Sequence, residues 1–304
     1  MAVSIGIIGT GWVGASVAIS VLQAGIATEL LLADLAAEVA EGEAMDLSHG
    51  AAFYPACNVR AVPVTGMLDT DALVIAAGKN GTPEQSRLEL LQGNASILRE
   101  IGTSLRDYRG LVIVVTNPVD VLTQIVAESS GLPSSRVIGT GTMLDTARLR
   151  QTIGESIGVD PRSVHAQVVG EHGDSEVVLW STAHVGGLPL RQWPGWSEAR
   201  EHESAEVVRR AGFEIIRRKG ATNHAIGLVT AALLRVLLRG ERRIETVSRV
   251  QDGACGVDGV ALSLPTVLDV GGAVQVVPPL LSAAELAALE RSATVLRDAR
   301  RSLD

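Results

Sequence analysis

Gly9-Thr10-Gly11-Trp12-Val13-Gly14 is the stretch that decides the fold, because it places three glycines between two apolar segments of different period. The segment before it, Val3 to Ile8, is typical of a short strand buried on both faces. The segment after it, Ala15 to Ala24, has the spacing of a helix. A strand, a tight glycine turn and a helix predict a dinucleotide site, in which backbone N–H groups at the helix N-terminus bind a pyrophosphate.

Asp34 supports this interpretation, because it ends the next predicted strand, Glu29 to Asp34, 20 residues after Gly14. A carboxylate at that place accepts hydrogen bonds from ribose hydroxyls and repels a 2′-phosphate, so we expect NAD rather than NADP. A glycine-rich turn beside an ordinary surface aspartate is the alternative. The candidate cofactor-binding residues of this region are Gly9, Gly11, Val13, Gly14 and Asp34.

Two more apolar runs, Ala72 to Ala77 and Leu111 to Thr116, follow at separations that leave room for helices. Thr82-Pro83-Glu84-Gln85 has the form of a capping box and predicts the start of one such helix. The alternation of strands and helices predicts an α/β fold with a doubly wound parallel sheet, the Rossmann type, over residues 1–140.

Beyond residue 140 the pattern changes to longer amphipathic helices and a β-rich stretch. One helix is predicted over Glu201 to Lys219, ended by Gly220, and the last over Ser282 to Ser302. Between them, Ile244 to Val277 is β-rich and punctuated by Gly and Pro. We therefore expect an α+β catalytic domain over residues 141–304, packed against the first domain with a cleft between them.

The composition excludes several classes of protein. The chain has 304 residues, of which 46% are hydrophobic, and a net charge of −8, so it can bury a large core but has no basic field to attract nucleic acid or an anionic membrane. Its two cysteines lack the spacing of a disulfide framework or a zinc site, which is typical of a reducing cytoplasm. The uncharged stretch from Met1 to Thr28 is interrupted by glycines, and we interpret it as buried strand and helix rather than as a signal peptide or membrane span.

Two motifs in the second half carry candidates for chemistry. Gly170-Glu-His-Gly-Asp-Ser-Glu176 places His172 beside a glycine, where its ring could face a cleft. Asp145 and Arg148 are three residues apart and would share one face of a helix. The functional interpretation is an aspartate that holds an imidazolium and an arginine that grips a carboxylate. A structural histidine and a surface ion pair are the alternatives. The histidines form no metal-ligand set with carboxylates, so we expect no metal.

These motifs, together with Ala44-Met-Asp-Leu-Ser-His-Gly50, Thr116-Asn-Pro-Val-Asp120 and Lys219-Gly-Ala-Thr222, resemble those of bacterial L-lactate dehydrogenases, within the lactate/malate dehydrogenase family. The resemblance runs from Val3 to the last helix. Glu171 and the stretch Trp180 to Pro189 resemble the lactate branch rather than its malate sister. The resemblance implies a cytoplasmic NAD-dependent homotetramer that reversibly reduces pyruvate to L-lactate, at the end of glycolysis.

The resemblance also implies roles for individual residues. It makes His172 the acid/base, Asp145 its partner, and Arg87 the arginine that polarises the substrate carbonyl. The substrate-binding residues would be Arg148 for the carboxylate, Asn117 for the oxygen (with a place in the cofactor site as well) and Thr222 for the pocket wall.

Three further positions bear on specificity and regulation. The residue that selects substrate in this family lies six positions before the loop arginine, where lactate enzymes have Gln and malate enzymes have Arg, and here it is Gly81. Gly81 lacks the guanidinium that would pair with a second carboxylate, so we expect a monocarboxylate to be preferred. Arg150 and His165 match positions that bind fructose 1,6-bisphosphate at a subunit interface in allosteric relatives, although either could be a solvated charge.

Two other functions stay open. A malate dehydrogenase or broad L-2-hydroxy acid dehydrogenase would share most of these motifs. A catalytically silent NAD-binding protein would share the glycine turn, but it would have no physical reason to keep Arg87, Asn117, Asp145, Arg148 and His172 together.

Overall fold

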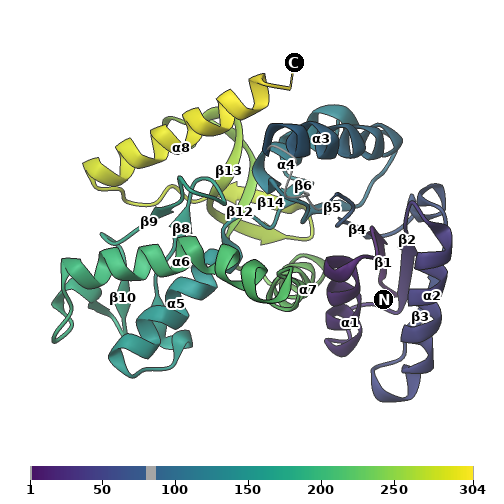
Figure 1. Ribbon diagram of the computed structural model, residues 1–304, viewed down its shortest axis with the longest axis horizontal. Coiled ribbons are helices and arrows are strands. Elements are labelled where there is room, and N and C mark those ends of the chain that lie inside the picture. Colours follow the sequence, from purple (N-terminus) through teal and green to yellow (C-terminus); the bar gives the residue numbers. More distant parts are fainter. Residues whose placement is uncertain (1, 80–86, 304) are drawn as a thin grey trace.

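The structure, a computed structural model, describes residues 2–79 and 87–303, and its described part is built around a nine-stranded sheet (Figure 1). Six neighbouring strands are parallel, in the order β3-β2-β1-β4-β5-β6, which is the order of a doubly wound Rossmann sheet. The predicted fold class is confirmed. The bounds of these strands are Ser4–Ile8 (β1), Glu29–Ala33 (β2), Asn58–Ala61 (β3), Ala72–Ile75 (β4), Leu111–Val114 (β5) and Val137–Gly139 (β6).

The four strands predicted in this half are all present. β1 ends at the predicted residue, and the other three end one or two residues before it. Two strands were not predicted. β3 has the sequence Asn-Val-Arg-Ala and lies at the edge of the sheet, where polar residues are tolerated. β6 has three residues, too few to show a period.

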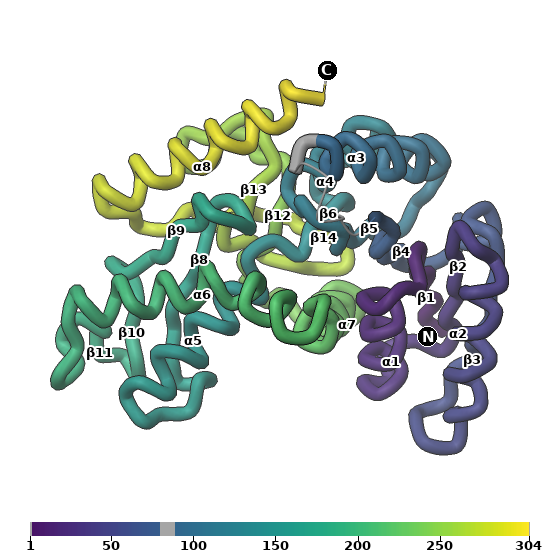
Figure 2. The backbone as a smooth tube through the Cα atoms, in the orientation of Figure 1, coloured from purple at the N-terminus to yellow at the C-terminus, as the bar shows by residue number. Residues whose placement is uncertain are grey.

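Helices cover both faces of the sheet (Figure 2). Successive strand side chains point to opposite faces. In β1, Ile5 and Ile7 pack with α1, α2 and α7 in one core, whereas Ile8 belongs to the core of α3, α4 and α8. The helices are Trp12–Gln23 (α1), Ala37–His49 (α2), Arg87–Ser104 (α3), Val119–Ser130 (α4), Met143–Ile157 (α5), Glu198–Lys219 (α6), His224–Arg239 (α7) and Ala283–Arg301 (α8), with short 3-10 turns at Ala51–Phe53, Val64–Met67, Pro161–Ser163, Leu190–Gln192 and Ala254–Gly256.

Capping residues explain where the long helices begin and end. The side chain of Ser197 accepts a hydrogen bond from the N–H of Arg200, so α6 begins three residues before the predicted Glu201. Gly220, with φ of 87°, ends it as predicted. Ser282 and Glu285 form a capping box that starts α8. The capping box predicted at Thr82 to Gln85 lies outside the described residues.

The β-rich stretch of the second half does not form a separate sheet. Its strands β12 (Ile244–Asp252), β13 (Asp258–Asp269) and β14 (Gly272–Val276) are antiparallel, and Ser248 of β12 pairs with Gly139 of β6. The strands therefore continue the Rossmann sheet, because β6 would otherwise present an unpaired edge. The predicted division at residue 140 stays a prediction, but the two parts on either side of it share one sheet.

A third apolar core packs α5 and α6 against two small sheets. One sheet has the order β11-β10-β7 and the other pairs β8 with β9. Their bounds are Val164–His165 (β7), Val168–Val169 (β8), Val177–Val178 (β9), His184–Val185 (β10) and Leu188–Pro189 (β11). Within residues 2–79 and 87–303, no helix is both long and apolar enough to span a membrane.

The three glycines of the first turn differ in how much space the fold leaves for a side chain. A Cβ on Gly14 would lie 1.9 Å from the carbonyl oxygen of Gly9, and one on Gly9, whose φ is 93°, would lie 2.4 Å from the backbone nitrogen of Ala77. A Cβ on Gly11 would meet no described atom within 4 Å. The fold therefore needs Gly9 and Gly14, whereas Gly11 leaves open space beside the start of α1.

We expect Gly14→Ala to destabilise the protein by about 1–3 kcal/mol or more, because its Cβ would push the turn away from α1. Gly11→Ala, at an ordinary φ of −66°, should cost much less. Thermal unfolding followed by circular dichroism compares the two, and equal melting temperatures would contradict this account.

Candidate active site

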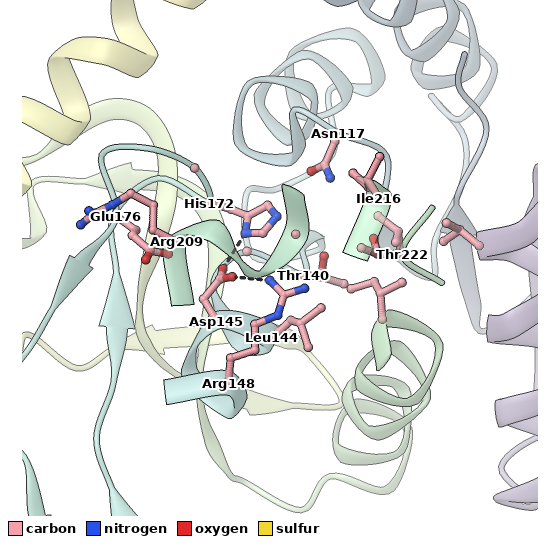
Figure 3. Close-up of a pocket in the computed structure, with 16 residues that line it drawn as sticks. Asn117, Thr140, Leu144, Asp145, Arg148, His172, Glu176, Arg209, Ile216 and Thr222 are labelled. Carbon is pink, nitrogen blue, oxygen red and sulfur yellow. Dashed lines mark hydrogen bonds and ion pairs between the residues drawn. The ribbon is translucent and has the colours of Figure 1, made fainter. Parts of the chain in front are cut away.

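A pocket lies at the carboxyl ends of β5 and β6 and has about 850 Å³ of empty space, with the open solvent at its mouth included (Figure 3). Its walls come from the start of α5, the loop after β8 and the second half of α6. Crevices at this edge of a parallel sheet are the usual ligand sites of doubly wound folds. The lining residues are Val13, Val115, Asn117, Thr140, Gly141, Leu144, Asp145, Arg148, His172, Gly173, Glu176, Arg209, Gly212, Ile216, Thr222 and Ile226.

Asp145 holds two cationic side chains at once. Its Oδ2 lies 2.5 Å from Nδ1 of His172, and its Oδ1 accepts a hydrogen bond of 3.0 Å from Nη1 of Arg148. The Asp145 side chain is 3% exposed. The expected i, i+3 pair is thus a buried one in the first turns of α5 rather than a surface ion pair, and the expected histidine joins it from 27 residues further along the chain.

The protonation of this pair follows from its surroundings. Burial opposes the charge on His172, but the Asp145 carboxylate more than offsets burial and raises the pKa of His172 to about 9. Burial likewise opposes the charge on Asp145, and His172 and Arg148 together still lower the pKa of Asp145 below its ordinary value. At neutral pH His172 is therefore an imidazolium, and its bond to Asp145 through Nδ1 leaves Nε2 for the pocket.

The structure places the other substrate-site candidates as follows. Asn117 and Thr222 line the pocket, Asn117 just before α4 and Thr222 between α6 and α7. The Oδ1 of Asn117 accepts a hydrogen bond from the N–H of Val119, which fixes the amide at the helix start. Arg87 is the first described residue of α3, and its side chain, like the whole of Gly81, lies outside what the structure describes. Their predicted roles stay predictions.

The cofactor-site candidates of the glycine turn lie together with Asp34, and Val13 connects them to the pocket. Asp34 follows β2, and its Oδ2 accepts a hydrogen bond of 2.8 Å from the N–H of Thr10, so the carboxylate is tied to the glycine turn. Val13, in the first turn of α1 directly after Gly11 and Trp12, lines the pocket. The open space beside Gly11 and the first N–H groups of α1 fit a pyrophosphate there. The residues present therefore fit a dinucleotide whose reactive end would reach His172.

Arg150 and His165 are not part of this pocket. The Nε of Arg150 donates a hydrogen bond of 3.1 Å to the carbonyl oxygen of Ala166, directly beside His165. The His165 ring stacks on that of His184, with centroids 4.8 Å apart. The two predicted effector residues thus lie close together in space, at a place distinct from the acid/base pair.

Two buried carboxyl groups near His172 were not predicted. Asp120, in the first turn of α4, is 2% exposed, and Glu176 in the pocket wall is 8% exposed. Both lie in motifs already quoted for the family resemblance, but sequence gives no sign that a charged residue is buried. The α6 residues of the pocket were also missed, because a helical pattern does not tell which polar positions face a neighbour.

Glu176 is held neutral by its surroundings. Burial raises its pKa to about 8, and the nearby Asp145 carboxylate adds to this, whereas Arg209, His172 and Arg148 act in the opposite direction. No described residue gives its Oε1 a hydrogen bond. In Figure 3 the side chains of Glu176 and Arg209 lie side by side, away from Asn117 and Thr222.

The described residues contain no group of three or more His, Cys, Asp or Glu that could hold a metal ion. The expectation of a metal-free site stays a prediction.

Comparison with known proteins gives one family over almost the whole chain. Residues 3–139 match the model of the lactate/malate dehydrogenase NAD-binding domain, and residues 142–302 match that of the lactate/malate dehydrogenase alpha/beta C-terminal domain. The chain is 45% identical to the L-lactate dehydrogenase of Salinibacter ruber, over 99% of this chain and 97% of that protein. It is 41% identical to the L-lactate dehydrogenase of Kosmotoga olearia, over 98% of this chain and 96% of that protein.

Solved structures give the same result. The minor L-lactate dehydrogenase of Enterococcus mundtii, in its ligand-bound form, superposes with a TM-score of 0.97 at 36% identity and covers 100% of this chain and 99% of its own. The lactate dehydrogenase MGS-M5, from a Medee basin deep-sea metagenome library, superposes with a TM-score of 0.96 at 38% identity, over 99% of both chains.

Glu176 generates a prediction about stability. Its pKa rises on folding from an ordinary 4.5 to about 8, so between these values the unfolded chain releases a proton that the folded protein keeps. Wild-type stability therefore falls as pH increases from about 4.5 to 8, and Glu176→Gln removes this loss. We expect the melting temperature of Glu176→Gln, relative to wild type, to rise steadily over that interval.

The control is Glu206→Gln, which removes an exposed carboxylate that pairs with Arg209 and should not reproduce the trend. A difference between Glu176→Gln and wild type that stays constant with pH would show that Glu176 is not a buried neutral acid.

Proposed function

Because the chain belongs to the lactate/malate dehydrogenase family, we propose that it reduces pyruvate to L-lactate with NADH, and performs the reverse oxidation, with His172 as acid/base. It is an NAD-dependent oxidoreductase, and NAD is its cofactor. The observation that carries the proposal is the bridge from His172 through the Asp145 carboxylate to Arg148, in a pocket that continues to the glycine turn at Val13.

The proton chemistry follows from that bridge. The imidazolium of His172 is tied to Asp145 through Nδ1, so Nε2 carries the proton that a substrate carbonyl oxygen needs. Bound NADH supplies the hydride that reaches C2 of a 2-oxo acid. After the proton leaves, Asp145 holds the neutral ring in the tautomer that can take a proton back during lactate oxidation. A pKa of His172 near 9 keeps the proton available at neutral pH.

The substrate is oriented by groups around the ring. Arg148 binds the substrate carboxylate, since its guanidinium lines the pocket while Nη1 is braced by Asp145. Asn117 bonds the substrate oxygen and borders the cofactor site, and Thr222 closes the pocket wall. Arg87 polarises the carbonyl, and this effect is expected in kcat more than in KM, because the charge on the oxygen develops in the transition state.

On the cofactor side, Gly9, Gly11 and Gly14 let the backbone approach the pyrophosphate, and Asp34 accepts hydrogen bonds from the adenosine ribose hydroxyls. A negative charge at Asp34 favours NAD over NADP. Residues 1–140 would thus hold the cofactor and residues 141–304 the groups that act on the substrate, apart from Arg87 and Asn117.

The experiment that tests the function measures NADH oxidation with pyruvate, oxaloacetate and longer 2-oxo acids. Because Gly81 offers no positive charge for a second carboxylate, leaving one unpaired costs several kcal/mol, whereas an oversized apolar pocket costs about 1–3 kcal/mol per missing methylene contact. We expect pyruvate to have a higher kcat/KM than oxaloacetate. The reverse order would make the protein a malate dehydrogenase, and the absence of turnover with every 2-oxo acid would leave a silent NAD-binding protein.

His172→Gln should lower kcat for pyruvate by about 10² to 10⁴, because it removes the proton donor. The affinity for NADH, measured by fluorescence titration, should change little. His202→Gln, which changes an exposed histidine of α6, is the control. Near-normal turnover of the His172 variant would overturn its assignment.

We further propose a cytoplasmic homotetramer that fructose 1,6-bisphosphate activates. Large exposed apolar side chains on α1, α2 and α6, such as Trp12, Met45 and Phe213, support association. The free thiols Cys57 and Cys255 fit a reducing compartment. Clustered positive charge from Arg150 and His165 of neighbouring subunits would disfavour the active assembly until a bisphosphate neutralises it.

The effector should therefore lower the apparent KM for pyruvate in the wild type and not in Arg150→Gln. Light scattering after gel filtration gives the assembly size. Identical pyruvate saturation curves with and without millimolar effector would rule out activation.

A further inference from the structure

The first turn of α4 holds the backbone of the acid/base histidine. Asp120, the second residue of α4, accepts a hydrogen bond of 2.7 Å through Oδ2 from the backbone N–H of His172, 52 residues further along the chain. Its other oxygen, Oδ1, is buried and receives no hydrogen bond from the described residues. A charged side chain buried in this way needs compensation from its surroundings.

Several groups around Asp120 supply that compensation. Burial raises its pKa to about 6, and the Ser248 hydroxyl, the His172 N–H and the His172 charge act against burial, whereas Glu171 adds to it. The first turn of a helix also favours a negative charge. These groups favour the carboxylate form of Asp120 at neutral pH.

His172 thus lies between two carboxylates from two different helices. Asp145, from α5, bonds the ring at Nδ1, and Asp120, from α4, bonds the backbone. The charged groups that act on His172 are these two carboxylates and Arg148 of α5, while Glu176 of its own loop is a neutral titratable neighbour and Glu171 lies beside Asp120. Asp145 and Asp120 favour the imidazolium, and Arg148 disfavours it.

We propose that Asp120 is a positioning residue for the acid/base histidine, which fixes the backbone of His172 and adds a second negative charge behind the imidazolium. The proposal deepens the proposed function and rests on the role of His172 in it. Asp120 acts through His172 and is not among the residues that line the pocket.

The position of Asp120 also links the two parts of the site. Asn117, three residues earlier, lines the pocket, and its carbonyl oxygen accepts a hydrogen bond from Asn94 of α3. The same turn of chain therefore carries a substrate-site amide and the anchor of the histidine loop. A shift of α4 would move both together, so their spacing across the pocket is kept.

A purely structural anchor is the competing explanation, and Asp120→Asn separates the two. The asparagine amide keeps an oxygen that can accept the His172 N–H, but it removes the charge. Glu285→Gln is a matched control, because Glu285 is also a buried carboxylate that accepts a backbone N–H, from Ser181, and it lies outside the pocket.

The experiment measures the pKa of His172 in the free enzyme, from the pH dependence of its modification by diethylpyrocarbonate, quantified on the His172 peptide by mass spectrometry. We expect Asp120→Asn to lower this pKa by about half a unit to one unit, and Glu285→Gln to leave it unchanged. The alkaline limb of kcat/KM for pyruvate should move by the same amount. Asp120→Ala, which also removes the anchor, should lower kcat by at least roughly tenfold more than Asp120→Asn.

An unchanged His172 pKa in Asp120→Asn, with or without a lower melting temperature, would reduce Asp120 to a structural anchor and overturn the proposal. This result is distinct from failure of the proposed function, because the modification assay needs neither substrate nor cofactor. If His172→Gln kept normal turnover, the function would be wrong whatever the pKa measurement gave.

Discussion

The shared carboxylate of Asp145 is the constraint on which the site depends. A buried carboxylate is unstable unless it is paired and hydrogen-bonded, and Asp145 meets this need with two cations at once, Arg148 from its own helix and His172 from a distant loop. The helix repeat fixes the first partner without tertiary structure. The second partner must be delivered by the fold, and losing either one would leave a poorly compensated charge. The same arrangement of Asp145, Arg148 and His172 therefore stabilises the buried carboxylate and prepares His172 for proton transfer.

The antiparallel extension of the sheet, β12 to β14, positions the loop that carries His172. Gly170, two residues before it, exchanges backbone hydrogen bonds with Ser263 of β13, at 2.8 and 2.9 Å. The hydroxyl of Ser263 also accepts a hydrogen bond from the N–H of Thr142, the residue that caps α5. One residue of the antiparallel extension thus fixes both the start of the helix that carries Asp145 and the loop that carries its partner. The geometry of the site therefore depends on β12, β13 and β14 continuing the parallel sheet.

Local patterns predicted a large part of this arrangement, and long-range pairing decided the rest. The glycine turn, four strands of the parallel sheet, the last residue of α6 and the extent of α8 follow from period and capping, which act over a few residues. The joining of β12 to β6 rests on pairing between Ser248 and Gly139, 109 positions apart, for which no local signal exists. The pairing of Asp145 with Arg148 could be predicted from their spacing in the sequence. The buried state of Asp120 and Glu176 was not, because the same residue types occupy solvated surfaces far more often.

The balance of charge in the pocket follows from these buried groups together. Around His172, the cations His172 and Arg148 are matched by Asp145 and Asp120, while Glu176 favours its neutral form and Arg209 in the pocket wall pairs with Glu206. An ionised Glu176 would add a negative charge to the wall of a pocket proposed to receive an anion. As pH rises through about 8 to 9, Glu176 ionises and His172 loses its proton, and both changes make the pocket more negative. Binding of the proposed anionic substrate is therefore expected to weaken at alkaline pH, and both His172 and Glu176 contribute to this change.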